Sequence, residues 1–138
     1  MQTVRVALFL ILASVSMFTS AQEASPARQE CSIERSHVEM RACLQVKAQT
    51  SANELGNVEA NMRKSLAAWD QDPVYIKRST SIFDSSAKQF TLFRTQQCEF
   101  IASLAAGGNG QGDLRLSCVS DLNEKRIAQI KQAQVHLQ

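Results

Sequence analysis

Four cysteines carry the clearest chemistry in this sequence, because a thiolate can bind a metal, attack a substrate or form a disulfide. They are Cys31, Cys43, Cys98 and Cys118. Their separations of 12, 55 and 20 residues include no Cys-x-x-Cys pair, and the two histidines, His37 and His136, lie far apart in the chain. We therefore expect no metal and no cofactor, and we expect both histidines on the surface. An even cysteine count behind an apolar leader instead predicts two disulfides in an oxidising compartment.

A glycine run lies between the last two cysteines, where it could serve as a phosphate cradle. The stretch GGNGQGD contains Gly107, Gly108, Gly110 and Gly112. This spacing does not fit G-x-G-x-x-G, and the residues that follow are Asp113 and Leu114 rather than the Lys and Ser or Thr of a P-loop. We therefore interpret the run as a bend between two helices, at which several residues adopt the positive φ that glycine tolerates.

No set of residues predicts catalysis, and we expect that the protein is not an enzyme. No serine or cysteine has the local sequence of a known nucleophile, and the acidic residues are scattered. Arg94 and Arg126 could bind an anionic group of a partner. We favour a structural role, in which each stem packs on the core and each guanidinium binds helix-end carbonyls or an acid such as Glu99 or Asp121.

The first 21 residues have the features of a secretory signal peptide: Arg5, an apolar run over residues 6–18, and a small-residue cleavage site that ends at Ala21. The run is short for a membrane span, which needs roughly 20 residues, and no cysteine stands at the cut for a lipid anchor. We therefore expect a periplasmic or secreted mature protein, residues 22–138. Its 14 basic and 13 acidic residues leave a net charge of +1, which predicts no nucleic-acid partner.

Within the mature chain, residues 22–35 are expected to form a polar lead-in and residues 36–138 a single helical domain, to which Cys31 is linked. Ser36 and Glu39 form a capping-box pattern at the start of the first helix. Asp72 and Pro73 end this helix and begin another. The expected buried face of the first helix is Met40, Leu44, Ala48, Ala52, Leu55, Val58, Met62, Leu66 and Trp69.

Two more helices complete the expected fold. The second helix ends near Ala106, and its start stays open between Pro73 and Ile82. The residues expected on its buried side are Phe83, Ala87, Phe90, Arg94, Cys98, Ile101 and Ala105, flanked by Phe93, Phe100 and Leu104. The third has Asp113 as N-cap and an apolar side of Val119, Leu122, Ile127, Ile130, Ala133 and Leu137. No long stretch alternates as a strand does. We therefore expect an all-α fold, an antiparallel three-helix bundle with two disulfides.

The expected bundle also suggests how the cysteines pair. Cys98 lies about 12 Å before the end of the second helix and Cys118 about 7 Å into the third, so an antiparallel hairpin brings them to a similar level. Cys31 reaches Cys43 if the chain folds back before the cap at Ser36. We favour Cys31–Cys43 with Cys98–Cys118. A crossed pairing stays open, because all four cysteines lie near one end of the bundle.

The cysteine frame, the segment QFTLFRTQQCEF, the glycines and NEKR after Cys118 together resemble the LprI-type lysozyme-inhibitor family, from Cys31 to about Ile130. The matching positions are the four cysteines, Gln89, Phe93, Arg94, Gly107, Gly108 and Arg126. The resemblance implies a small bacterial extracytoplasmic helical domain. It also implies inhibition of lysozyme by protein binding, which requires no catalytic group in the inhibitor.

The residues and the resemblance together favour a helical binding domain, with lysozyme or another envelope protein as its partner. The alternative is an envelope-stress or small-ligand-binding module without lysozyme activity. The patch around Phe90, Phe93 and Phe100 is interpreted as core, because a ligand pocket needs polar groups that converge on it.

Overall fold

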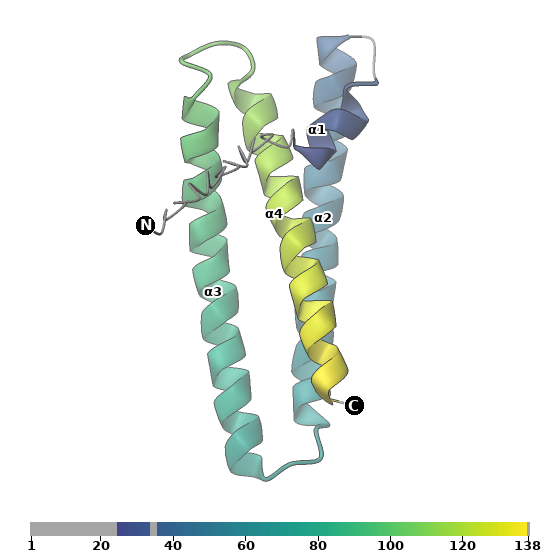
Figure 1. Ribbon diagram of the computed structural model, residues 1–138, viewed down its shortest axis with the longest axis vertical. Helices are drawn as coiled ribbons and strands as arrows, with labels where there is room; N and C mark the ends of the chain where they lie inside the picture. The colour runs from purple at the N-terminus through teal and green to yellow at the C-terminus, as the bar shows by residue number, and fades with distance from the viewer. Residues whose placement is uncertain (1–24, 34–35, 138) are drawn as a thin grey trace, which may run out of the picture.

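The computed structural model describes residues 25–33 and 36–137, so the expected signal peptide lies outside the described residues. In chain order the elements are α1 (Pro26–Cys31), α2 (His37–Ala67), α3 (Pro73–Ser103), α4 (Gln111–Gln134) and the 3-10 turn η1 (Val135–Leu137). The described part has no strand, which confirms the all-α fold class. The expected number of helices is wrong by one, because part of the expected lead-in forms α1. Figure 1 shows α4 crossing obliquely from the top of α3 toward the lower part of α2.

Local signals set the ends of α2 and α3 as the sequence predicts. The Ser36 hydroxyl accepts a hydrogen bond from the Glu39 N–H at 3.2 Å, and the Glu39 carboxylate accepts one from the Ser36 N–H at 2.9 Å. At the start of α3 the Asp72 carboxylate accepts from the Val74 N–H at 2.8 Å. Pro73 is the first residue of α3, so the helix begins at the earliest of the positions left open.

The start of α4 differs from the expectation. The helix begins at Gln111, and its N-cap, Gly110, provides no side-chain hydrogen bond. Asp113 lies inside the first turn and is 1% exposed. Its carboxylate accepts from Arg41 Nε at 2.9 Å and lies 2.6 Å from His37 Nε2. His37 is half-exposed, in agreement with the expected surface position, and it also links α2 to α4.

The glycine run lies in the turn between α3 and α4. Gly107 has a φ of 83°, and Ala106 before it has a φ of 49°. The other glycines of the bend keep negative φ, so two residues of the bend adopt positive φ where several were expected. The carbonyl of Asn109 in this turn accepts from Arg41 Nη2 at 2.8 Å, which ties the turn to α2.

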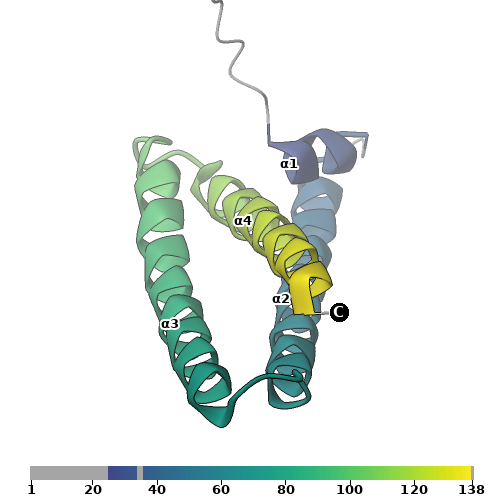
Figure 2. The ribbon, with the colours of Figure 1, turned by 60° about the horizontal axis from the view of Figure 1, so that its bottom comes forward.

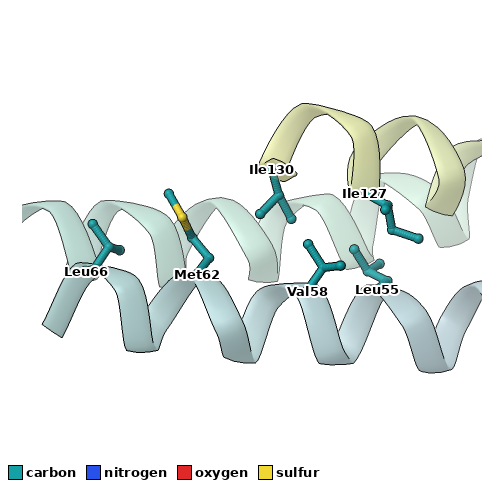
Figure 3. Packing of buried hydrophobic residues seen from close by; sticks show 6 residues of the cluster. All are labelled: Leu55, Val58, Met62, Leu66, Ile127 and Ile130. Carbon is teal, nitrogen blue, oxygen red and sulfur yellow. The ribbon is translucent and has the colours of Figure 1, made fainter. Parts of the chain in front are cut away.

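The apolar core lies between α2 and the second half of α4 (Figure 3). Its buried members are Leu55, Val58, Met62, Leu66, Ile127 and Ile130. From α3 only Phe83 and Phe90 pack against it, and both are partly exposed. The expected core face of α2 is largely right, except that Ala52 is exposed and Ser51 takes a buried place. The core is therefore mainly a two-helix interface.

The buried stripe of α4 changes from polar to apolar along the helix. Its members are Asp113, Ser117, Ser120, Asn123, Ile127 and Ile130, at steps of three and four residues. The Asn123 amide donates to the Ser51 hydroxyl at 3.1 Å, and its oxygen accepts from Arg94 Nη1 at 2.6 Å. Small polar side chains let α2 and α4 approach closely here, and hydrogen bonds offset their burial. The expected buried residues Val119 and Leu122 are only half-buried.

A disulfide holds the short helix α1 on the top of the α2–α4 pair, where Cys31 bonds Cys43. Ala27 and Cys31 are buried with Leu44 in a second small cluster. The Ala27 N–H donates to the Asp121 carboxylate at 3.0 Å. A six-residue helix is not stable alone in water, so these contacts explain why α1 forms.

The helix α3 leans away from α2 and meets α4 near its upper end (Figure 2). Of its 31 residues only Ala87, Cys98 and Ala102 are buried. Cys98 bonds Cys118 of α4, with the Cα atoms 5.5 Å apart, so both disulfides have the pairing favoured from the sequence. Beside this bond, Arg115 donates two hydrogen bonds to Glu99 and holds the pKa of the Glu99 carboxyl below its usual value.

Removal of the Cys98–Cys118 bond should therefore loosen α3 more than α2. We expect the C98S/C118S variant to lose about 3 kcal/mol of unfolding free energy from loop-closure entropy alone. Urea unfolding measures the loss, and amide hydrogen exchange locates it. If hydrogen exchange accelerated equally in α2 and α3, the Cys98–Cys118 bond would not be the main attachment of α3.

The buried Asp113 should contribute more to stability than an exposed acid in an ion pair. Asp113→Ala removes the carboxylate that Arg41 Nε and His37 Nε2 contact, and we expect a loss of about 1–3 kcal/mol of unfolding free energy. The control is Glu54→Ala, which breaks the exposed pair with Lys131 and should cost at most about 1 kcal/mol. Urea unfolding with intact disulfides compares the two variants. If both lost the same unfolding free energy, the buried Asp113 would contribute no more than an exposed acid.

Candidate functional site

A line of exposed apolar side chains runs along one side of α3 and is the most distinctive surface of the molecule. Its members are Tyr75, Ile82, Phe93, Phe100 and Leu104, all between 51 and 63% exposed. Their intervals of 7, 11, 7 and 4 residues are close to whole numbers of turns at about 3.6 residues per turn, so the side chains lie on one side of the helix. We call this set the α3 stripe. It extends about 43 Å from Tyr75 to Leu104, given the helical rise.

The α3 stripe corrects the interpretation of the phenylalanines as core. Phe90 is half-buried against the core, but Phe93 and Phe100 are exposed, and so is Leu104. The reason is the lean of α3, because α4 contacts the side of α3 that carries Cys98, Arg94 and Ala87. Side chains about 100° away around the helix are left in solvent. Exposed large apolar residues in such a row are typical of a surface that binds another protein.

A groove of about 580 Å³ lies between α1, α3 and α4, next to the upper part of the α3 stripe. Gln97 and Ile101 of α3 line one wall, and Gln97 lies one helical turn from Phe93 on the same side. Asp121 and Lys125 of α4 and Arg28 of α1 supply charged groups at the other walls. A partner that covers the stripe can therefore also place side chains in a groove whose walls combine apolar surface with these charged groups.

The positions that carry the family resemblance separate into two groups in space. Gln89 and Phe93 are exposed on α3, on or next to the α3 stripe. Arg94 and Arg126 point into the bundle: Arg94 binds Asn123, and Arg126 Nη2 donates to the Ser86 hydroxyl at 2.8 Å. Neither arginine has the acid partner considered from the sequence. Glu99 is bound by Arg115, and Asp121 accepts from the backbone of α1.

The remaining candidates do not form a reactive centre. Gly107 and Gly108 lie in the turn after α3, and His136 is exposed in η1. Among residues 25–33 and 36–137, no three side chains of the types His, Cys, Asp or Glu gather as metal ligands do. In the same part of the chain, no helix is long and apolar enough to cross a membrane.

Fold and surface together define a class: a helical domain linked by two disulfides, with an exposed apolar row on one helix and an adjoining groove. Residues 28–130 match the family described as lysozyme inhibitor LprI, so the chain belongs to that family. No curated protein and no solved structure gives a significant match to the chain. The family resemblance inferred from the cysteine frame is confirmed.

If the α3 stripe serves binding rather than folding, charged residues in it should be tolerated. We expect Phe93→Glu and Phe100→Glu each to change the unfolding free energy by no more than about 0.5 kcal/mol, because the side chains are exposed and Glu favours a helix. A buried reference, Leu44→Ala, should cost roughly 2–5 kcal/mol. Thermal or urea unfolding tests this. If Phe93→Glu or Phe100→Glu lowered the unfolding free energy as much as Leu44→Ala does, these side chains would have to be part of the folded core.

Proposed function

We propose that this protein is a lysozyme inhibitor that covers its target with the α3 stripe. Family membership supports the target, since the family is described as lysozyme inhibitors. The α3 stripe supports the mode of binding, because aromatic side chains that are exposed in the free protein dominate the energy of many protein interfaces. The exposed row on α3 is the single observation that carries this part of the proposal.

An inhibitor of this kind needs no reactive group of its own. The chemistry belongs to the target, in which two carboxylates flank the glycosidic bond in a cleft. A rigid partner that blocks the cleft or covers its mouth prevents substrate from entering. We therefore propose that the protein has no catalytic activity.

The shape of the surface suits an extended contact. A stable interface buries about 800 Å² on each partner, and the α3 stripe with the adjoining groove offers contacts along most of one helix. The stripe also lies on a helix that is covalently tied through Cys98, so little conformational entropy is lost on binding. These features favour binding by a preformed surface.

Charge supplies little of the proposed affinity. Lysozymes are commonly basic, and the expected mature chain carries 14 basic and 13 acidic residues, so long-range attraction is weak. We therefore propose apolar contact as the main source of affinity. We also propose that the protein acts outside the cytoplasm, after removal of the leader, where its disulfides persist and cell walls are accessible.

The test is lysis of cell-wall suspensions by lysozymes of several classes, followed by turbidity, with stoichiometric oxidised protein. We expect slower lysis by at least one lysozyme, with little change as salt rises within the range that the enzyme tolerates. The F93E/F100E variant should inhibit more than tenfold more weakly, because it places charges where aromatic side chains contact the target.

A matched control lies next to the altered residue. Leu92 is 50% exposed and Phe93 is 51% exposed. Leu92 lies about 100° around the helix from Phe93 and outside the α3 stripe, so Leu92→Glu should inhibit like the original protein. Absence of inhibition at micromolar excess over every lysozyme tried would reject the inhibitor function. Equal inhibition by F93E/F100E and the original protein would reject the α3 stripe as the binding surface.

A further inference from the structure

A second hollow, of about 380 Å³, lies between the lower halves of α2 and α3 and the end of α4. Its walls are largely apolar and include Met62 of α2, Trp69 just after the end of α2, Ile82 of α3, and Ile130 of α4. Its volume lies within the range of pockets that bind small molecules. Figure 2 shows α2 and α3 diverging from the end at which they are joined, and the cavity lies between these two helices and the end of α4.

One cationic side chain, Arg126, reaches this largely apolar cavity, whose other polar lining residues are Ser79, Ser86 and Gln129. Its Nη2 donates to the Ser86 hydroxyl, which is neutral, and its guanidinium carbon lies 5.5 Å from the centre of the Phe90 ring. Its Nε is buried and has no hydrogen-bond partner among the described residues. Within the described part of the chain, no carboxylate lies within ion-pair distance of Arg126, whereas Arg41, Arg63 and Arg115 each have one.

A half-buried guanidinium without a counter-charge is costly, and an anion beside its accessible N–H groups would lower that cost. Arginine binds carboxylates in particular, because its planar N–H groups match the two carboxylate oxygens. The apolar walls next to it favour an aliphatic chain over a polar body. The cavity therefore has complementary features for both ends of an amphipathic anion.

We infer that the cavity binds a fatty acid of medium chain length, with the hydrocarbon chain between α2, α3 and α4 and the carboxylate on Arg126. This site is separate from the proposed inhibition of lysozyme and does not depend on it. Ile82 belongs both to the cavity wall and to the α3 stripe, so the mouth of the cavity lies beside the stripe.

The protein carries its own reporter for this site, because Trp69 is the single tryptophan of the sequence and lies in the cavity wall. Oxidised mature protein is titrated with laurate below the concentration at which it forms micelles. We expect a saturable blue shift of Trp69 fluorescence at one laurate per protein. Dodecanol, which has the same chain without the charge, should bind about tenfold more weakly, and dodecyltrimethylammonium should bind more weakly still.

Two variants, together with one control, test where the carboxylate and the hydrocarbon chain of laurate bind. Arg126→Met should lower the affinity for laurate to that for dodecanol, whereas Arg115→Met, on the same helix but paired with Glu99 outside the cavity, should keep the preference. Ala133→Phe narrows the cavity and should weaken the binding of both compounds. Circular dichroism checks that each variant is folded.

The inference fails if laurate and dodecanol bind the original protein equally, since Arg126 would then not recognise the carboxylate. It also fails if neither compound gives a saturable change, or if Ala133→Phe leaves laurate affinity unchanged. The comparison of laurate with dodecanol uses the original protein, so it remains decisive even if Arg126→Met does not fold.

Discussion

The Cys98–Cys118 bond is the constraint on which the arrangement of this molecule depends, because α3 shares so little of the core. The apolar cluster is formed by α2 and α4, and α3 adds only the partly exposed Phe83 and Phe90. A 31-residue helix with three buried residues would not be held by apolar contact alone. The disulfide fixes its upper end, and hydrogen bonds from Arg94 and Arg126 fix it further down. These contacts tie α3 to α4 at points along its length and leave much of its surface uncovered.

This mode of attachment explains where the functional surfaces lie. A helix packed closely into a three-helix core would bury Phe93 and Phe100 and would fill the space near Trp69. Because α3 leans away from α2, its apolar side chains form the α3 stripe instead, and a cavity remains between its lower half and the other helices. The exposed row and the cavity thus have one physical origin.

The polar half of the α2–α4 interface helps to fix the relative positions of the three long helices. Asp113, Ser117, Ser120 and Asn123 occupy buried positions that apolar residues would usually fill. Asp113 joins α4 to Arg41 and His37 of α2, and Asn123 joins Ser51 of α2 to Arg94 of α3. Such directional contacts favour one register of the helices over others, which a uniform apolar stripe would do less strictly. We interpret these polar contacts as the reason that α3 has a defined position although few of its residues are buried.

The sequence by itself determined the helical fold class, the caps at Ser36 and Asp72, the favoured cysteine pairing and the family, because each depends on local chemistry or on fixed spacing along the chain. It did not reveal α1, whose six residues have no apolar period and form a helix only against α2 and α4. It also placed Asp113 at a cap and Phe93 in the core. The positions of these side chains depend on how far α3 leans and on which side of α4 faces α2. Only the tertiary structure decides this, because hydrophobic periodicity cannot identify a buried stripe made of Asp, Ser and Asn, nor show that an apolar side of a helix has no neighbour.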